Sequence, residues 1–148
     1  MAGYKIKDNS REVLERFNRN KEKTLQEIGL KWQEIATKEV TAMGVVDTGR
    51  FRASLSYITP EYESGVNIMS GAVPESEPGD VLHGQAPKDA VVVGSNVEYA
   101  PYLEYGYITT RGTNIGGRPT VTNAVMNYKG DYMEIIERNM GGGFKIKL

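Results

Sequence analysis

The segment LQEIGLKWQEIATKEVTAM, residues 25–43, determines how the rest of the chain is expected to fold. Its apolar residues recur at steps of three, four and seven, which places them on one face of an α-helix. The pattern continues towards the N-terminus through Phe17, and no proline interrupts it. Asn9 is a suitable N-cap, and Gly44 is typical of a residue that ends a helix. The sequence therefore predicts one long helix over residues 10–43.

This helix is longer than one face of its domain requires. At 1.5 Å per residue it would span roughly 50 Å, in a chain of only 148 residues. The apolar stripe also becomes sparse at residues 18–23. We therefore expect the first turns to project from the domain or to contact another subunit.

Short β-strands are expected after the helix. Leu55 and Tyr57 alternate with serines, which predicts a strand that ends before Pro60. Residues 90–94 are an apolar run typical of a buried strand, and residues 66–69 could form another short strand.

The segment between the two clearer strands has no sustained period. Residues 60–88 hold four of the six prolines in the chain, and proline-rich segments are typical of loops. We therefore expect a mobile loop insertion at residues 60–88, exposed from about Pro74 to Pro87.

The C-terminal third is expected to be mainly helical. Pro101 near its start and Gly106 after its end predict a one-turn helix. Residues 107–118 are expected to form a Gly/Thr/Arg loop, residues 119–140 a closing helix, and residues 141–148 a tail. The order of elements predicts a single α+β domain over residues 1–148, with a long N-terminal helix and a C-terminal helix packed on a small antiparallel β-sheet.

Composition excludes several kinds of chemistry. The chain has no cysteine and one histidine, His83, so disulfides, thiolate metal sites and multi-histidine metal sites are excluded. No apolar run approaches the ~20 residues that span a bilayer, and no membrane partner is expected. We expect no catalytic residues, no cofactor, no bound metal and no enzymatic activity.

The charges are segregated along the chain. Residues 59–107 contain eight acidic residues against Lys88 alone, whereas residues 108–148 contain six basic and three acidic residues. Strong DNA binding needs a dense basic face, so a nucleic-acid-binding module is a weaker alternative. Segregated charge instead suits complementary contacts between protein surfaces.

Asp47-Thr48-Gly49 is the one motif that could indicate an enzyme. Aspartic proteases share a proton between two aspartates, so a single copy would require a symmetric dimer. A dimeric aspartic-type protease is therefore a second alternative. The favoured interpretation is that the Asp47 side chain accepts hydrogen bonds from the next backbone amides.

A tyrosine cluster and two arginines are the candidate interface residues. Tyr99, Tyr102 and Tyr105 lie close together in the sequence, and tyrosine is enriched at interfaces because it combines a large apolar area with a hydroxyl group. Arg111 and Arg118 lie in the expected loop and could bind acidic residues of a neighbouring subunit.

Three blocks of sequence resemble a known family. They are VDTGRFRASL at 46–55, VVGSNVEYAPYLEYG at 92–106, and Arg118-Pro119 before the final helix. In this order they resemble the tail-component family of long-tailed bacteriophages, the tail-completion or head–tail-joining proteins of phages and prophages. The resemblance covers about residues 10–140.

The resemblance implies a small structural protein without enzymatic activity. It would belong to the virion, after assembly in the bacterial cytoplasm, and would contact other phage neck and tail proteins. Related neck proteins assemble into rings, so a homo-oligomeric ring is expected in the particle. Contact with DNA would be at most incidental, in the channel. The loop at residues 60–88 would be the candidate for contacting an adjacent ring or this channel.

Overall fold

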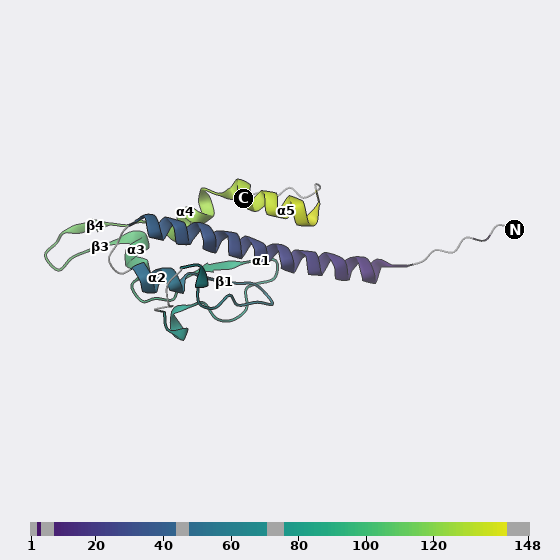
Figure 1. The fold of residues 1–148 in the computed structure, drawn as a ribbon, viewed down its shortest axis with the longest axis horizontal. Helices are drawn as coiled ribbons and strands as arrows, with labels where there is room; N and C mark the ends of the chain where they lie inside the picture. The colour runs from purple at the N-terminus through teal and green to yellow at the C-terminus, as the bar shows by residue number, and fades with distance from the viewer. Residues whose placement is uncertain (1–2, 4–7, 44–47, 71–75, 142–148) are drawn as a thin grey trace.

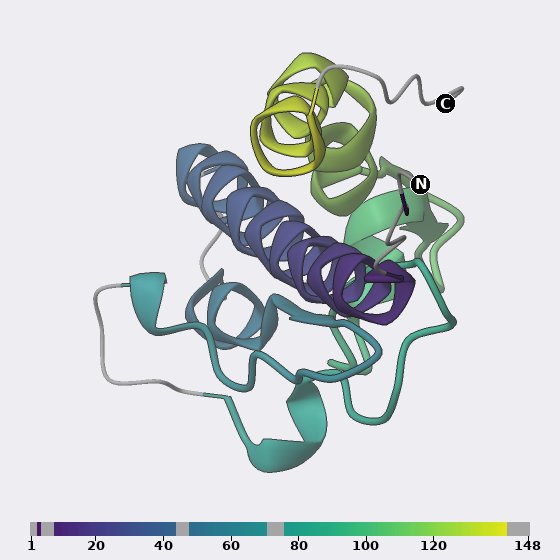
Figure 2. The same cartoon turned by 90° about the vertical axis from the view of Figure 1, so that its right-hand side faces the viewer.

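The computed structural model describes residues 3, 8–43, 48–70 and 76–141, and one long helix runs through its middle (Figure 1). The remaining elements lie on two sides of this helix, α1, as the end-on view also shows (Figure 2). The α+β class and the long N-terminal helix are confirmed. The helices are α1 (Ser10–Ala42), α2 (Thr48–Ser54), α3 (Ala100–Tyr105), α4 (Thr120–Met126) and α5 (Lys129–Met140), and the strands are β1 (Ser56–Ile58), β2 (Val92–Gly94), β3 (Gly106–Ile108) and β4 (Asn114–Gly116).

From Thr24 onwards α1 is buried along one face, whereas residues 10–20 are exposed. Asn9 is the N-cap residue, as predicted, but its side chain makes no capping hydrogen bond. Asp8 instead accepts a hydrogen bond from the Ser10 amide at 3.0 Å. At the other end the Met43 amide donates to Val40, whereas the predicted stop at Gly44 lies outside the described residues.

The two clearer strands are confirmed and pair with each other. β1 and β2 are antiparallel, with Ser56 opposite Gly94 and Ile58 opposite Val92. The strand expected at residues 66–69 is wrong, since Ile68–Ser70 is a 3-10 helix. The buried side chain of Asn67 explains this turn: it accepts a hydrogen bond from the Met69 amide at 3.1 Å.

The expected exposed loop at residues 60–88 is wrong for its second half. Asp80, Val81 and Ala86 are buried, and Pro78–Asp80 forms a 3-10 helix. The Ser56 hydroxyl accepts a hydrogen bond from the Leu82 amide at 2.8 Å, which ties this segment to β1. Residues 71–75 lie outside the described part of the chain.

A β-hairpin replaces the loop expected at residues 107–118. β3 and β4 are antiparallel, with Tyr107 opposite Ile115. Gly106 has a φ of +79°, and a Cβ atom there would lie 2.3 Å from the Ile115 carbonyl oxygen. Glycine is therefore required where α3 turns into the hairpin. The hairpin projects at the end of the molecule opposite the start of α1 (Figure 1).

The closing helix is interrupted, so the prediction of one helix over residues 119–140 is wrong. α4 ends where the Asn127 amide donates to Asn123, and α5 begins after Tyr128, whose φ of −124° lies outside the helical range. The predicted tail falls outside the described residues from residue 142 onwards.

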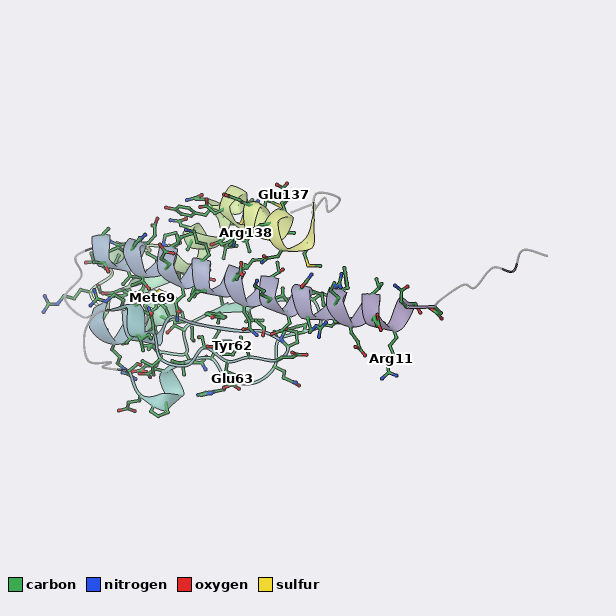
Figure 3. All side chains as sticks on the ribbon, turned by 45° about the vertical axis from the view of Figure 1, so that its right-hand side comes forward. Arg11, Tyr62, Glu63, Met69, Glu137 and Arg138 are labelled. Atoms are coloured by element: carbon green, nitrogen blue, oxygen red, sulfur yellow. The ribbon has the colours of Figure 1, made fainter. Side chains whose placement is uncertain are left out.

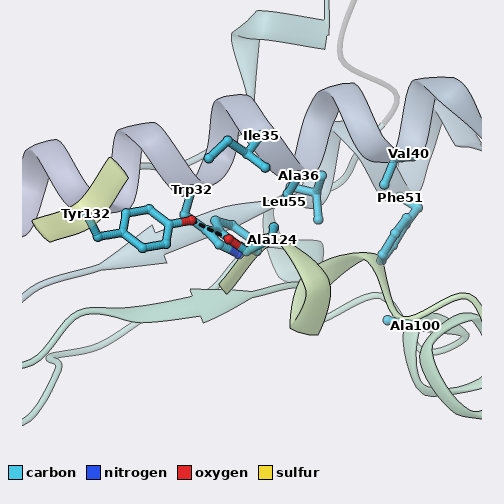
Figure 4. Packing of buried hydrophobic residues seen from close by; sticks show 9 residues of the cluster. All are labelled: Trp32, Ile35, Ala36, Val40, Phe51, Leu55, Ala100, Ala124 and Tyr132. Carbon is cyan, nitrogen blue, oxygen red and sulfur yellow. Dashed lines mark hydrogen bonds between the residues drawn. The ribbon is translucent and has the colours of Figure 1, made fainter. Parts of the chain in front are cut away.

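The core lies between α1 and the elements on both of its sides (Figure 4). Trp32 is 1% exposed, and its indole N–H donates to the Val121 carbonyl at 3.3 Å. The Tyr132 hydroxyl donates to the carbonyl of Ala124. The first bond connects α4 to α1, and the second connects α5 to α4. The buried cluster consists of Trp32, Ile35, Ala36, Val40, Phe51, Leu55, Ala100, Ala124 and Tyr132.

Candidate interaction surfaces

The structure separates the three predicted interface tyrosines. Tyr99 is half-buried against the core, and the Arg50 guanidinium carbon lies 5.9 Å from its ring centroid. Tyr102 is 58% exposed and Tyr105 is 81% exposed. Two of the three are therefore available to a partner, whereas Tyr99 contributes to the domain itself.

Exposed residues of the hairpin extend this tyrosine cluster into a larger apolar area. Tyr107, Ile108 and Ile115 are exposed and lie on β3 and β4. The rings of Tyr102 and Tyr107 meet edge to face, with their centroids 5.9 Å apart. We call Tyr102, Tyr105, Tyr107, Ile108 and Ile115 the hairpin surface. The two isoleucines were not among the predicted interface residues, because each strand has three residues and no recognisable alternation.

The two predicted arginines have different surroundings. Arg111 is exposed in the turn between β3 and β4, and it makes no ion pair with any residue that the structure describes. Arg118 is also exposed, but its guanidinium donates to the Met43 carbonyl at 3.2 Å. Arg111 is thus the better candidate for an acidic partner, and Arg118 connects the hairpin base to the end of α1.

Glu104 fixes the base of the hairpin to the helix that follows it. Its buried carboxylate accepts hydrogen bonds from the Val121 amide at 2.7 Å and from the Thr122 amide at 3.4 Å. The Thr120 and Thr122 hydroxyls donate to the same carboxylate, each at 3.2 Å. A carboxylate here satisfies the free amides at the start of α4. No local sequence signal predicts this cap, because Glu104 lies on a different helix.

A second apolar surface is a groove of about 1190 Å³ beside the first half of α1. α4 and α5 form one wall, and residues 60–61 and 88–93 contribute to another. Leu14, in the part of α1 expected to project, is 59% exposed in this groove. The apolar residues that line the groove are Leu14, Phe17, Leu25, Ile28, Trp32, Pro60, Val91, Val93, Val125, Met126, Tyr132, Met133, Ile136 and Met140.

The charged residues of the groove include three acids and three lysines. Asp89 binds the Lys21 ammonium at 2.5 Å, and this bond lowers the pKa of Asp89. Glu22 accepts hydrogen bonds from Gln26 and Thr59. Glu61 is exposed, and its carboxylate has no partner among the residues that the structure describes.

Part of the acidic segment is neutralised inside the molecule. Arg50 binds both carboxylate oxygens of Asp80, at 2.7 and 2.8 Å, and binds Glu98 at 3.0 and 3.2 Å. The hydrogen bonds from Arg50 lower the pKa of Asp80. This bidentate contact holds residues 76–80 against α2. Its arrangement is that of a structural ion pair.

Arg138 and Glu63 lie on opposite sides of α1 (Figure 3), and each takes part in a surface contact. On α5, Arg138 donates to Glu27 of α1 at 2.7 Å. On the other side, the single histidine lies 3.2 Å from the Glu63 carboxylate and 2.6 Å from the Pro78 carbonyl. The hydrogen bond with the Pro78 carbonyl raises the pKa of His83 most, and the hydrogen bond with Glu63 raises it further. His83 therefore connects two loops at the surface.

The described residues also bear on metal binding and on membrane insertion. They contain no group of three or more His, Asp or Glu side chains placed to hold a metal ion. None of the helices in the described ranges is long and apolar enough to cross a membrane. Asp47 of the protease-like motif lies outside those ranges, so the structure does not test its predicted role. In comparisons with known proteins, no family model, no curated protein and no solved structure matches the chain.

Proposed function

We propose that this protein is a structural component of a bacteriophage or prophage particle, which completes the tail or joins it to the head. The three sequence blocks that resemble tail components support the proposal. The single observation that carries it is the placement of two apolar surfaces with exposed side chains, the hairpin surface and the groove, towards opposite ends of α1. Large exposed apolar areas on a folded chain are typical of contact surfaces for other proteins.

The protein would act through subunit contacts, without a catalytic step. The hairpin surface lies at one end of the chain, and the apolar groove lies towards the other. One chain would therefore contact two neighbours at once. The fixed base of the hairpin supports such a role, because a rigid element loses little conformational freedom on binding. The neighbours would be other neck or tail proteins and further copies of the chain, within the virion.

Deletion of the gene from a phage that encodes it tests the proposal. We expect electron microscopy of the lysate to show filled heads together with separate or aberrant tails, and the titre of infectious particles to fall. Wild-type protein supplied from a plasmid should restore joined particles. Normal infectious particles after deletion would contradict the proposed function.

A further inference from the structure

We propose that the hairpin surface of one copy binds in the groove of a second copy of this chain. The inference rests on the proposed function and names the surfaces through which that function would be performed. Both surfaces are apolar, and both present exposed side chains in the single chain. In the groove these are Leu14, Phe17, Val125 and Met126. Burying Tyr105 and Ile108 against the leucine, methionine and aromatic residues of the groove would remove both areas from water.

A chain cannot insert its hairpin into the outer end of its own groove. Arg118, at the hairpin base, binds Met43 at the end of α1, whereas Leu14 lines the groove near the start of α1. A helix rises 1.5 Å per residue, so roughly 40 Å separate Leu14 from Met43. The hairpin also extends away from the helix start (Figure 1). A second copy must therefore supply the hairpin.

The groove holds as many lysines as acids, so charge favours a second copy through one specific pair. Arg111 is the only charged residue of residues 106–117, and it lies in the exposed turn of the hairpin. Of the three acids in the groove, Asp89 is bound to Lys21 and Glu22 accepts two hydrogen bonds, whereas Glu61 has no partner within the described ranges. Arg111 of one copy and Glu61 of the next would form the pair that each lacks in the single chain.

The two surfaces differ, so their contact joins copies head to tail. Such a heterologous contact closes into a ring when the rotation between copies permits, and otherwise gives an open chain. A symmetric contact between two identical patches would instead stop at a dimer. The distribution of oligomer sizes therefore distinguishes the proposed contact from self-pairing of either surface.

Disulfide trapping tests the contact, because the natural chain contains no cysteine. A full-length variant carrying both Ile108→Cys and Leu14→Cys, oxidised and separated without reductant, is expected to give a ladder of dimers, trimers and larger species. Within one chain these two positions are too far apart for a disulfide, which needs Cα atoms within roughly 7 Å. Each single variant can give only dimers. The matched control pairs Ile108→Cys with Glu134→Cys, an exposed α5 residue that does not line the groove.

A ladder no stronger than that of the control pair would overturn the inference, as would dimers alone. A monomer that carries a small apolar molecule in native mass spectrometry would also overturn it, because the groove would then have a different occupant.

Charge reversal gives a second test with exposed residues, which keeps the fold intact. Arg111→Glu alone and Glu61→Arg alone should each lower the fraction of trimers and larger species at least several-fold, and the double variant should restore it. Glu134→Arg is the control and should leave that fraction unchanged. Equal loss in the single and double variants would contradict the pairing of Arg111 with Glu61. If heads and tails stay unjoined after gene deletion but no ladder forms, the proposed function stands and this contact fails.

Discussion

The core and the hairpin surface use the same kinds of side chain in opposite ways. Trp32 is 1% exposed and Tyr132 is buried, and the polar atom of each donates a hydrogen bond to a backbone carbonyl. Tyr105 is 81% exposed and Ile108 is 73% exposed. An aromatic or branched residue therefore does not reveal its role by its type. Its role depends on whether the backbone places it between elements or at their outer end.

The largest effect on the core is expected from Trp32→Ala. Removal of a fully buried Trp side chain typically costs about 3–5 kcal/mol of unfolding free energy, because a cavity remains. The variant would also lose the hydrogen bond that connects α1 to Val121 of α4. Urea unfolding measured by circular dichroism should show the loss. Trp32→Phe, which keeps most of the volume, is the control and should cost much less. Wild-type stability in Trp32→Ala would contradict the core described above.

Gly29→Ala tests the same core from the side of β1. Alanine favours a helix over glycine by about 1 kcal/mol, but its Cβ atom would lie 2.2 Å from Cδ2 of the Tyr57 ring. Overpacking of a core costs about 1–3 kcal/mol, so after the gain in helix propensity we expect a net loss of up to about 2 kcal/mol. A double-mutant cycle with Tyr57→Leu should show that the cost depends on the ring. A more stable Gly29→Ala variant would show that the ring moves away without cost.

Glu104→Gln is expected to weaken the junction between the core and the hairpin surface. The amide keeps one oxygen acceptor but presents an N–H₂ group to donors at the start of α4. Loss of a helix cap costs about 1–2 kcal/mol. Hydrogen exchange should speed up first at the amides of Val121 and Thr122. Unchanged exchange there would contradict the capping role.

The sequence predicted the elements whose signals are local. The apolar period of α1 extends over many turns, and Pro101 and Gly106 bound α3, so both helices are where the pattern placed them. Leu55 to Ile58 and the apolar run at 90–94 likewise contain β1 and β2.

The remaining features depend on contacts between distant residues. The hairpin strands are three residues long and largely exposed, so hydrophobic alternation could not reveal them. Glu104 caps a helix from 17 positions before Val121. From the sequence, Gly29 only weakens the helix slightly. The structure shows that the buried ring of Tyr57 leaves no room for a side chain there. Of the candidate interface residues, Tyr102, Tyr105 and Arg111 are exposed on one end, whereas Tyr99 contributes to packing.

His83 gives a smaller, pH-dependent effect at the surface. Its pKa is raised above the usual 6.5, so protonated His83 stabilises the fold below pH 6.5, and this stabilisation is lost as the pH rises through the raised pKa. The hydrogen bond from the Gly84 amide is the larger cause, and that with His83 the smaller, of a pKa of Glu63 below its usual 4.5. The contribution of Glu63 to stability is therefore lost as the pH falls through this lowered pKa. The contact between His83 and Glu63 should therefore be strongest at a pH between these two pKa values.

Thermal unfolding of wild type and His83→Gln at about pH 5.5 and about pH 8 measures this effect. The difference in Tm should be larger at the lower pH and should nearly vanish at the higher one. A difference independent of pH would show that the ring acts only through packing.

Tyr105→Ser should change the free energy of unfolding least, and this sets the hairpin surface apart from the core. A side chain that is 81% exposed loses little burial on truncation, and such surface changes usually stay within about 0.5 kcal/mol. If the same variant, placed in the Ile108→Cys, Leu14→Cys background, also shortens the cross-linked ladder, then Tyr105 contributes to association and not to folding. A loss of stability comparable to that of Trp32→Ala would instead make the hairpin part of the core. Only the combination of unchanged folding and weaker association identifies an aromatic residue kept exposed for a partner.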